Sequence, residues 1–290
     1  MFLWWRGKDS NLRRPKSTGL QPAPFDRFGT PPWNYKNSTN SIYALFKQEN
    51  IMTKTFWIGG KNTVIEAIKN PQRKIKRVAT SKNFEEFNTL NFKSIKIEKV
   101  EINFFNKIFK DKNFVHQGIG AEVEPLKSED IKNDISNLKN LIVLDNITDP
   151  RNLGSILRTA LAFGIDGVIV QKKNFKSSSP MMNKSASGAI EKLKIYQVSN
   201  IGNIIRLLKK NSFWIYGMSS NTDKFFSQLK TFDEKNVFIF GSEGKGMSPN
   251  NQTLCDDIFK IKISEKIDSL NVSNAVSATL ALFSFQRQTF

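Results

Sequence analysis

Apolar runs alternate with helical patterns throughout the second half of the chain. Strands are predicted at NLIVLDNI (140–147), DGVIV (166–170), FWIYGM (213–218), NVFIFG (236–241) and IFKIKI (258–263). Helices are predicted at SILRTALAFG (155–164), at IGNIIRLLKKN (201–211) and from SLNVSNAV (269–276) onward. Ser269 or Asn271 is well placed as the N-cap of the last helix. Because runs that are apolar throughout suit strands buried on both faces, residues 140–290 are predicted to form an α/β domain around a parallel sheet.

A smaller α/β domain is predicted for residues 52–125. The segment NTVIEAIKN places Val64, Ile65 and Ile68 on one face of a short helix, which ends before Pro71. Strands are predicted at IKRVATS (75–81), SIKIEKVE (94–101) and IGAEVE (119–124), with phenylalanine-rich helical segments between them. Residues 126–139 are polar and charged, which is typical of a linker.

Residues 1–51 differ in kind from the rest of the chain. They hold half of the ten prolines and three of the five tryptophans, with no apolar period of a strand or a helix. A segment of this kind is expected to form a disordered tail. The piece KDSNLRRPKSTGLQPAPFDRFGTPP also resembles peptides that arise when a structural-RNA gene is translated by mistake. Translation is therefore expected to start at Met52.

Charge and composition narrow the function classes. The formal net charge of +18 indicates a polyanionic partner such as a nucleic acid, although acidic lipids or a merely lysine-rich surface are the alternatives. No apolar stretch is long enough for a membrane helix, so a cytoplasmic protein is expected. The single cysteine, Cys255, excludes an intramolecular disulfide and a multi-thiolate zinc site, and no metal is expected. For His116, the only histidine, a structural role is favoured over general-base chemistry.

The glycine-rich stretch FIFGSEGKGMSPN (238–250) follows a predicted strand but matches neither common nucleotide-binding pattern. A Walker loop needs Ser or Thr after its Gly-Lys pair, whereas Gly246 follows Lys245, and the spacing of the glycines does not give GxGxxG. Phosphate loops bind anions through bare backbone N–H groups, and the carboxylate of Glu243 would repel such a ligand. The loop is therefore predicted to serve something other than a phosphate.

A specific resemblance is carried by three segments, each placed after a predicted strand. They are DNITDPRNLGSILRTALAFG (145–164), FIFGSEGKGM (238–247) and IKISEKIDSLNVSNAVS (261–277). Together and in this order they resemble the SpoU (TrmH) family of RNA ribose 2′-O-methyltransferases. Upstream, WIGGKNTVIEAIKN (57–70) and VHQGIGAEVEP (115–125) resemble the start and end of the small RNA-binding domain in the branch that methylates a guanosine of 23S rRNA.

The resemblance implies a Rossmann-like sheet tied in a deep trefoil knot, the SPOUT fold, behind a smaller N-terminal RNA-binding domain. Its last loops would form the pocket for S-adenosyl-L-methionine, a cofactor without phosphate. The residues that would line the cofactor or shape its loop are Gly241, Gly244, Gly246, Met247, Ile261 and Leu270. Those that would close the pocket are Asn271, Ser273 and Asn274, although Ser and Asn at a helix start are often only caps.

The resemblance also places Asn152 and Arg158 at the reacting ribose. The acceptor hydroxyl loses its proton as its oxygen attacks the methyl group, so the site must position the ribose and accommodate alkoxide charge. Because a guanidinium is not deprotonated in proteins, Arg158 is expected to grip the adjacent phosphate and stabilise negative charge. Water or Glu243 would take the proton, and Glu243 is equally suited to orient Asn152 or Arg158.

The expected activity is methylation of a guanosine ribose in 23S rRNA by a homodimer, with Arg158 reaching across to the partner's cofactor. A tRNA ribose 2′-O-methyltransferase is an alternative, disfavoured because tRNA-modifying relatives more often carry short helical extensions than a complete α/β module. A non-catalytic RNA-binding or ribosome assembly factor is the alternative from another class. The presence of Asn152, Arg158 and Glu243 together argues against it.

Overall fold

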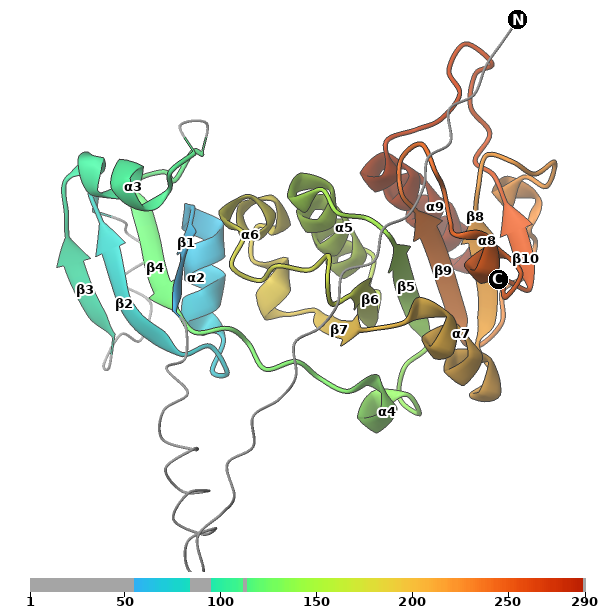
Figure 1. Ribbon diagram of the computed structural model, residues 1–290, viewed down its shortest axis with the longest axis horizontal. Helices are drawn as coiled ribbons and strands as arrows, with labels where there is room; N and C mark the ends of the chain where they lie inside the picture. The colour runs from blue at the N-terminus through green and yellow to red at the C-terminus, as the bar shows by residue number, and fades with distance from the viewer. Residues whose placement is uncertain (1–54, 84–94, 112–113, 289–290) are drawn as a thin grey trace, which may run out of the picture. The chain divides into compact units, whose positions relative to one another are not determined.

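The computed structural model describes residues 55–83, 95–111 and 114–288, which belong to the same structural unit (Figure 1). The predictions of a disordered tail and of a start at Met52 concern residues outside this described part. Two sheets organise the described residues, a small one before residue 125 and a larger one after residue 139.

The smaller sheet has the strand order β1-β4-β2-β3. Its elements are β1 (Phe56–Gly59), α2 (Lys61–Lys69), β2 (Ile75–Thr80), β3 (Lys96–Lys99), α3 (Ile102–Ile108) and β4 (Ile119–Val123). Neighbouring side chains on a strand point to opposite faces. Val78 accordingly packs in the cluster that contains Val64 of α2, whereas Ala79 packs with Phe105 of α3. The two helices therefore cover opposite faces of this sheet.

The larger sheet is parallel throughout the described residues and has the order β10-β8-β9-β5-β6-β7. Its strands are β5 (Asn140–Asp145), β6 (Gly167–Gln171), β7 (Lys194–Val198), β8 (Trp214–Met218), β9 (Asn236–Gly241) and β10 (Asp257–Phe259). Its helices are α4 (Ile131–Asp134), α5 (Pro150–Ala162), α6 (Pro180–Ala186), α7 (Ile201–Lys210), α8 (Pro249–Gln252) and α9 (Val272–Gln288), with a 3-10 turn, η2 (Ala189–Glu191), after α6.

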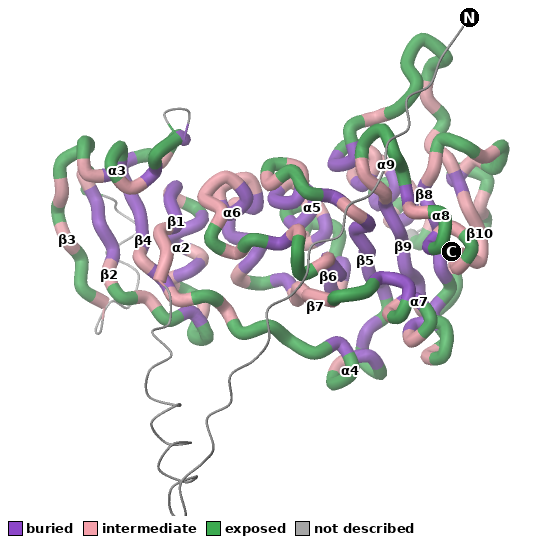
Figure 2. Tube along the Cα trace, in the orientation of Figure 1, coloured by how far each residue is buried: buried purple, intermediate pink, exposed green. Residues whose placement is uncertain are grey.

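Helices cover both faces of the larger sheet, so its central strands are buried along their length (Figure 2). Ile142 and Leu144 of β5 pack in the same cluster as residues of α5, α6 and α9. Leu141 and Val143 face the other way, into a cluster that includes α4 and α7. This three-layer arrangement explains why the strands read as continuous apolar runs, and it confirms the predicted α/β class.

The structure differs from the sequence prediction at several elements. The predicted strand 258–263 is shorter, because β10 ends at Phe259 and the chain then makes an isolated bridge between Lys260 and Phe225. Helix α5 begins five residues earlier than the predicted 155, at Pro150. Asp149 caps it, because its carboxylate accepts from the backbone N–H groups of the second and third helical residues. Strands β1 and β7 and helix α6 were not predicted.

The segment 126–139 contains α4 and packs on the larger sheet. Ile131, Ile135 and Leu138 are buried in the cluster on the α7 face, although most of the segment is polar. Of the two N-caps predicted for the last helix, Asn271 is the one observed. It precedes α9 and accepts from the backbone N–H of Ser273 at 2.9 Å. The trefoil knot stays a prediction.

His116 lies against the aromatic cluster of the smaller domain. Its ring stacks on Phe105 at a centroid distance of 4.8 Å, and its Nδ1 accepts from the backbone N–H of Gly118 at 3.1 Å. Burial, assisted by the charges of Lys184 and Lys82, holds the pKa of His116 below its ordinary value. The neutral imidazole is therefore the form that the fold favours.

Acidification is expected to weaken the fold at this position. Because the folded pKa of His116 is depressed, its contribution is complete above the unfolded pKa of about 6.5 and is lost as pH falls below it. The thermal midpoint of His116→Asn, which keeps an acceptor near Gly118 but does not titrate, should approach that of the wild type as pH falls from about 7 to about 5. Parallel midpoint curves would show that protonation of His116 is not coupled to folding.

Candidate active site

Three of the predicted segments converge at one edge of the larger sheet. Parallel strands end at the same edge, and the segments that follow β5, β9 and β10 are those that carry Asn152, Glu243 and Asn271. Asn152 is the third residue of α5, Glu243 lies two residues past the end of β9, and Asn271 precedes α9. Residues far apart in the chain thus lie together.

The carboxylate of Glu243 is the centre of this cluster. Its Oε1 accepts from Asn271 Nδ2 at 2.7 Å and from Asn152 Nδ2 at 3.1 Å, and from the backbone N–H of Val272 at 3.3 Å. Val272 is the first residue of α9, so its N–H has no partner inside the helix. The glutamate of the glycine-rich loop thus connects the N-terminal ends of α5 and α9 through hydrogen bonds.

The hydrogen bonds also fix which way each amide points. A backbone N–H can only donate, so the atom of Asn271 that faces Ser273 N must be Oδ1. Its Nδ2 then faces Glu243 and the Oδ1 of Asn152, at 3.1 Å from the latter. Asn152 therefore directs its own Nδ2 to Glu243. An amide nitrogen carries two N–H groups, and one of those on Asn152 has no acceptor among the described residues.

The glycines of the loop are required by the protein's own packing. A Cβ added at Gly241 would lie 2.0 Å from the carbonyl carbon of Gly246 and from the nitrogen of Met247, so no side chain fits there. Gly244 and Gly246 have φ of +80° and +64°, which side chains disfavour. Ser242 and Gly246 exchange backbone hydrogen bonds of 3.1 and 2.8 Å across the turn. The loop is thus a closed turn that presents Glu243.

Asp145 supports this edge of the sheet and was not singled out from the sequence. It ends β5 and is 1% exposed, and its Oδ2 accepts from Ser248 N at 2.8 Å and from Asn251 Nδ2 at 2.9 Å. It therefore ties the end of the glycine-rich loop to the central strand. The available sequence signal was an acidic residue at the end of a buried strand, since such a charge needs nearby partners.

The other predicted pocket residues lie around the same edge with unequal accessibility. Ile261 and Leu270 are half-buried in the segment between β10 and α9. The Met247 side chain is 1% exposed and packs in the core on the α7 face, so only its backbone borders the loop. Ser273 is also buried, and its Oγ donates at 2.6 Å to Oδ1 of Asn271, the residue that caps α9. Asn274 is exposed on the first turn of α9.

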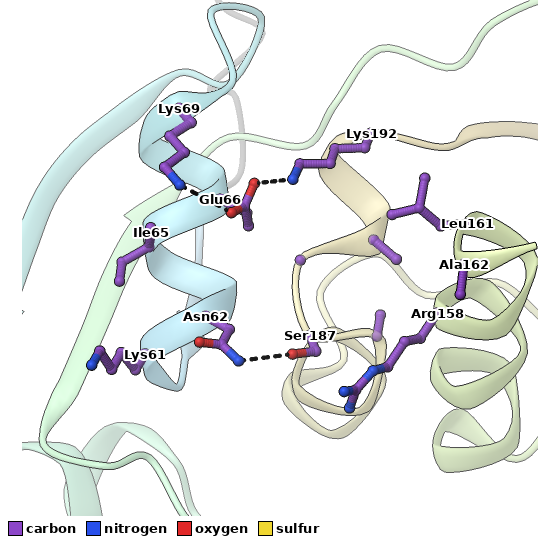
Figure 3. Close-up of a pocket in the computed structure, with 13 residues that line it drawn as sticks. Lys61, Asn62, Ile65, Glu66, Lys69, Arg158, Leu161, Ala162, Ser187 and Lys192 are labelled. Atoms are coloured by element: carbon purple, nitrogen blue, oxygen red, sulfur yellow. Dashed lines mark hydrogen bonds and ion pairs between the residues drawn. The ribbon is translucent and has the colours of Figure 1, made fainter. Parts of the chain in front are cut away.

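Arg158 does not join this cluster within its own chain. It lies six residues after Asn152, about one and two-thirds turns of α5, so the two side chains leave the helix on different faces. The Arg158 side chain extends from α5 toward the segment of Ser187 and lines a cavity there (Figure 3). No described residue forms a hydrogen bond or an ion pair with it.

The chemistry available at this edge is that of amides, a carboxylate and backbone N–H groups. Among the described residues, no group of three or more His, Cys, Asp or Glu side chains could hold a metal ion. Burial raises the pKa of Cys255 to about 12, so the thiol is not a nucleophile at neutral pH. No described helix is long and apolar enough to cross a membrane.

Comparison with known proteins identifies both parts of the chain. A model of the SpoU rRNA methylase family matches residues 139–281, and a model for RNA 2′-O ribose methyltransferase substrate binding matches residues 57–129. An uncharacterized tRNA/rRNA methyltransferase of Borreliella burgdorferi is 37% identical over 209 residues, 67% of this chain and 89% of the relative. A putative TrmH family tRNA/rRNA methyltransferase of Staphylococcus aureus is 35% identical over 182 residues, 61% of this chain and 72% of the relative.

The fold also has solved counterparts. The SpoU methyltransferase AviRb from Streptomyces viridochromogenes, crystallised with AdoMet, superposes with a TM-score of 0.67 at 21% identity. The match covers 81% of this chain and 91% of that one. The chain thus has an α/β domain with a polar cluster at the carboxyl edge of its parallel sheet, preceded by a domain that matches the substrate-binding model. This chain belongs to the SpoU rRNA methylase family, and its class is that of an RNA methyltransferase.

Proposed function

We propose that this chain transfers a methyl group from S-adenosyl-L-methionine to the ribose 2′-OH of a guanosine in 23S rRNA. The hydrogen-bonded cluster of Asn152, Glu243 and Asn271 carries the proposal. It unites the three segments of the family resemblance at the edge of the sheet where such folds bind ligands. A protein that only binds RNA has no need for an amide held at both ends in this position.

The residues at this edge fit the proposed cofactor. S-adenosyl-L-methionine carries a cationic sulfonium and no phosphate, so a carboxylate at Glu243 is compatible with it. An added Cβ at Gly244 or Gly246 would meet nothing within 4 Å, so the turn leaves its backbone open to a ligand. The half-buried Ile261 and Leu270 supply apolar surface for the adenine ring. When bound, the cofactor supplies the electrophilic methyl group.

The proposed roles of the polar residues follow from their geometry. Glu243 and Asn271 hold the amide of Asn152. The second N–H of this amide donates to the ribose 2′-oxygen and stabilises the negative charge that develops there as the hydroxyl loses its proton. Glu243 is thus a positioning residue, and water takes the proton. Arg158 stays charged and holds the phosphate beside the reacting ribose.

We further propose that the chain works as a homodimer with shared sites. Helices α5 and α9 contact each other, with Thr159 Oγ1 and Ser277 Oγ 3.3 Å apart. Phe163 at the end of α5 is 38% exposed and Phe285 of α9 is 70% exposed. Apolar side chains exposed on these two helices suit a second copy of the chain. Across such an interface Arg158 would reach the partner's site, which supports the choice of this face.

The choice of 23S rRNA rests on the substrate-binding domain. The matched domain at residues 57–129 is a complete α/β module, which favours the rRNA branch over tRNA enzymes with short extensions. Both curated relatives carry names that leave tRNA and rRNA open. A tRNA ribose 2′-O-methyltransferase is therefore the second candidate.

Deleting the gene is expected to remove one 2′-O-methylguanosine from 23S rRNA. The measurement is a map of 2′-O-methyl groups in rRNA and tRNA from cells with and without the gene. Complementation with Lys230→Gln, an exposed residue between β8 and β9, is the matched control and should restore the signal. Loss confined to tRNA would favour the second candidate, and unchanged maps would favour a non-catalytic factor.

A further inference from the structure

A cavity of about 530 Å³ lies between α2, α5 and residues 187–192 (Figure 3). Its polar lining includes Lys61, Glu66 and Lys69 of α2, Arg158 of α5 and Lys192, which follows η2. The walls therefore come from the substrate-binding domain on one side and from the catalytic domain on the other. None of the groups assigned to methyl transfer, apart from Arg158, faces this cavity.

The lining is strongly cationic. The lining contains four basic residues and a single carboxylate, Glu66, which pairs with Lys192 at 2.6 Å and with Lys69 at 3.3 Å. Burial raises the pKa of Glu66, but the hydrogen bonds and charges of the two lysines outweigh it and leave the pKa below its ordinary value. Glu66 therefore stays ionised and neutralises only part of the positive charge.

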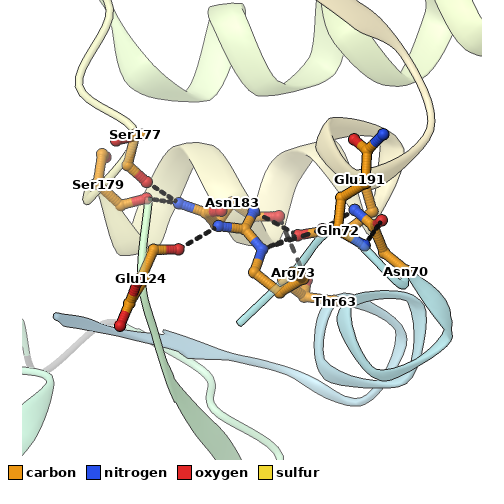
Figure 4. A network of polar contacts seen from close by, with 9 residues as sticks. All are labelled: Thr63, Asn70, Gln72, Arg73, Glu124, Ser177, Ser179, Asn183 and Glu191. Carbon is orange, nitrogen blue, oxygen red and sulfur yellow. Dashed lines mark hydrogen bonds and ion pairs between the residues drawn. The ribbon is translucent and has the colours of Figure 1, made fainter. Parts of the chain in front are cut away.

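The two walls are fixed to each other by buried contacts (Figure 4). Arg73, which follows α2, forms hydrogen bonds with both carboxylate oxygens of Glu191, which ends η2. Thr63 of α2 donates to the carbonyl of Asn183 in α6 at 3.2 Å. A Cβ added at Gly188 would meet the Glu66 side chain at 2.6 Å, so the backbone of that segment lies directly on α2. The cavity is thus preformed.

We propose that this cavity binds phosphates of the RNA backbone next to the methylated nucleotide. Arg158 forms one end of the cavity and is proposed to hold the phosphate beside the reacting ribose, so the RNA strand can continue from that ribose along these lysines. Phosphodiesters match the chemistry, because several separate cations suit a chain of single negative charges. The inference rests on the proposed function and names the surface that aligns its substrate.

Lysine substitutions in the cavity are expected to weaken RNA binding. The probe is a short labelled single-stranded RNA of mixed sequence, titrated with the full protein at several salt concentrations. Lys192→Gln and Lys69→Gln should each weaken binding several-fold and reduce the slope of log K against log salt by about 0.7, the value for one lost phosphate contact. The control Lys230→Gln removes an equal charge elsewhere and should change neither quantity by a comparable amount.

Glu66→Gln tests the same idea in the opposite direction. It removes the one carboxylate of the lining and frees Lys69 and Lys192 for phosphates, so RNA should bind several-fold more tightly with a steeper salt slope. Glu234→Gln, whose side chain is 82% exposed near the start of β9, is the matched control. An ion-pair cluster that only joins the domains would give no tightening. Thermal midpoints of all variants check that each is folded.

The outcomes separate the cavity from the reaction. Unchanged affinity in the lysine variants, or weaker binding by Glu66→Gln, overturns the cavity proposal while methyl transfer by the wild type leaves the proposed function standing. The expected shifts in a protein that transfers no methyl group to any RNA would sustain the cavity and overturn the proposed function. If the wild-type protein binds free phosphate tightly but does not bind the RNA, the proposal is also overturned.

Discussion

Glu243→Ala is expected to reduce methyl transfer by a factor of about 10²–10³, the usual effect of losing an oriented donor at a developing oxyanion. The substitution removes the acceptor shared by Asn152 Nδ2 and Asn271 Nδ2, so the amide of Asn152 is no longer held. Little stability should be lost, because Glu243 is exposed at the loop. The measurement is transfer of labelled methyl from the cofactor to RNA, with the thermal midpoint as a check of folding.

Glu243→Gln distinguishes positioning from base catalysis. A glutamine keeps an oxygen that can accept from both asparagines, but it cannot take a proton at neutral pH. If Glu243 positions Asn152, the glutamine variant should retain most of the turnover that the alanine variant loses. Equal loss in the two variants would identify Glu243 as the base and contradict the role assigned to it here.

Mixing two inactive variants tests whether the sites are shared. Arg158→Ala should likewise reduce turnover strongly, and a heterodimer with Glu243→Ala would hold one site that lacks both residues and one that lacks neither. Random re-association should then restore about a quarter of the wild-type activity. A mixed sample that stays inactive, after mass spectrometry has confirmed heterodimers, would refute the shared site and leave the methyltransferase assignment in place.

The sequence predicted most of the larger sheet because burial on both faces leaves a local signal. Strand β5 is apolar at each position from Leu141 to Leu144, and the structure buries all of them. The same reasoning extended the strand that begins at Ile258 too far. Its alternating Ile and Lys residues fit a half-exposed strand, but after Phe259 the backbone bonds instead to Lys224 and Phe226 of a distant loop. A local pattern contains no information about such partners.

The polar cluster of the candidate site was predictable as a set of residues but not as a geometry. Each of Asn152, Glu243 and Asn271 follows a strand, so their common edge could be expected from parallel topology. That one oxygen of Glu243 takes three donors could not, because it depends on where α9 begins in space. The orientation of the Arg158 side chain was equally unpredictable. Helical spacing places it on a different face of the helix from Asn152 but does not indicate which residues it contacts.

The contact between the two domains is the feature least predictable from the local sequence. Arg73 and Glu191 are 118 residues apart, and no motif in the sequence links them. In the fold their side chains are only 2% and 1% exposed, and the shortest bond between them is 2.6 Å. Arg73 Nη1 also donates to the carbonyl of Glu124, and Asn70 Nδ2 donates to Glu191. The ion pair is therefore buried, and further hydrogen bonds fix the orientation of both side chains.

Arg73→Ala is accordingly expected to lower the free energy of unfolding by about 3–5 kcal/mol, because it leaves the Glu191 carboxylate buried without its partner. Arg77 offers the matched control, since it also pairs with two carboxylates, Glu98 and Glu122, but its side chain is 38% exposed. Arg77→Ala should cost about 1 kcal/mol or less. Urea denaturation measures both.

A double variant shows whether that cost comes from the stranded charge or from the lost contact itself. Arg73→Met combined with Glu191→Leu removes both charges and keeps apolar volume, so it should recover most of the stability that Arg73→Ala loses. If the double variant is as unstable as Arg73→Ala, the directed hydrogen bonds that Arg73 and Asn70 donate to Glu191 hold the domains together, rather than the absence of an unpaired charge. If Arg73→Ala proves as mild as Arg77→Ala, the two domains are not joined through this pair, and the walls of the basic cavity are free to separate.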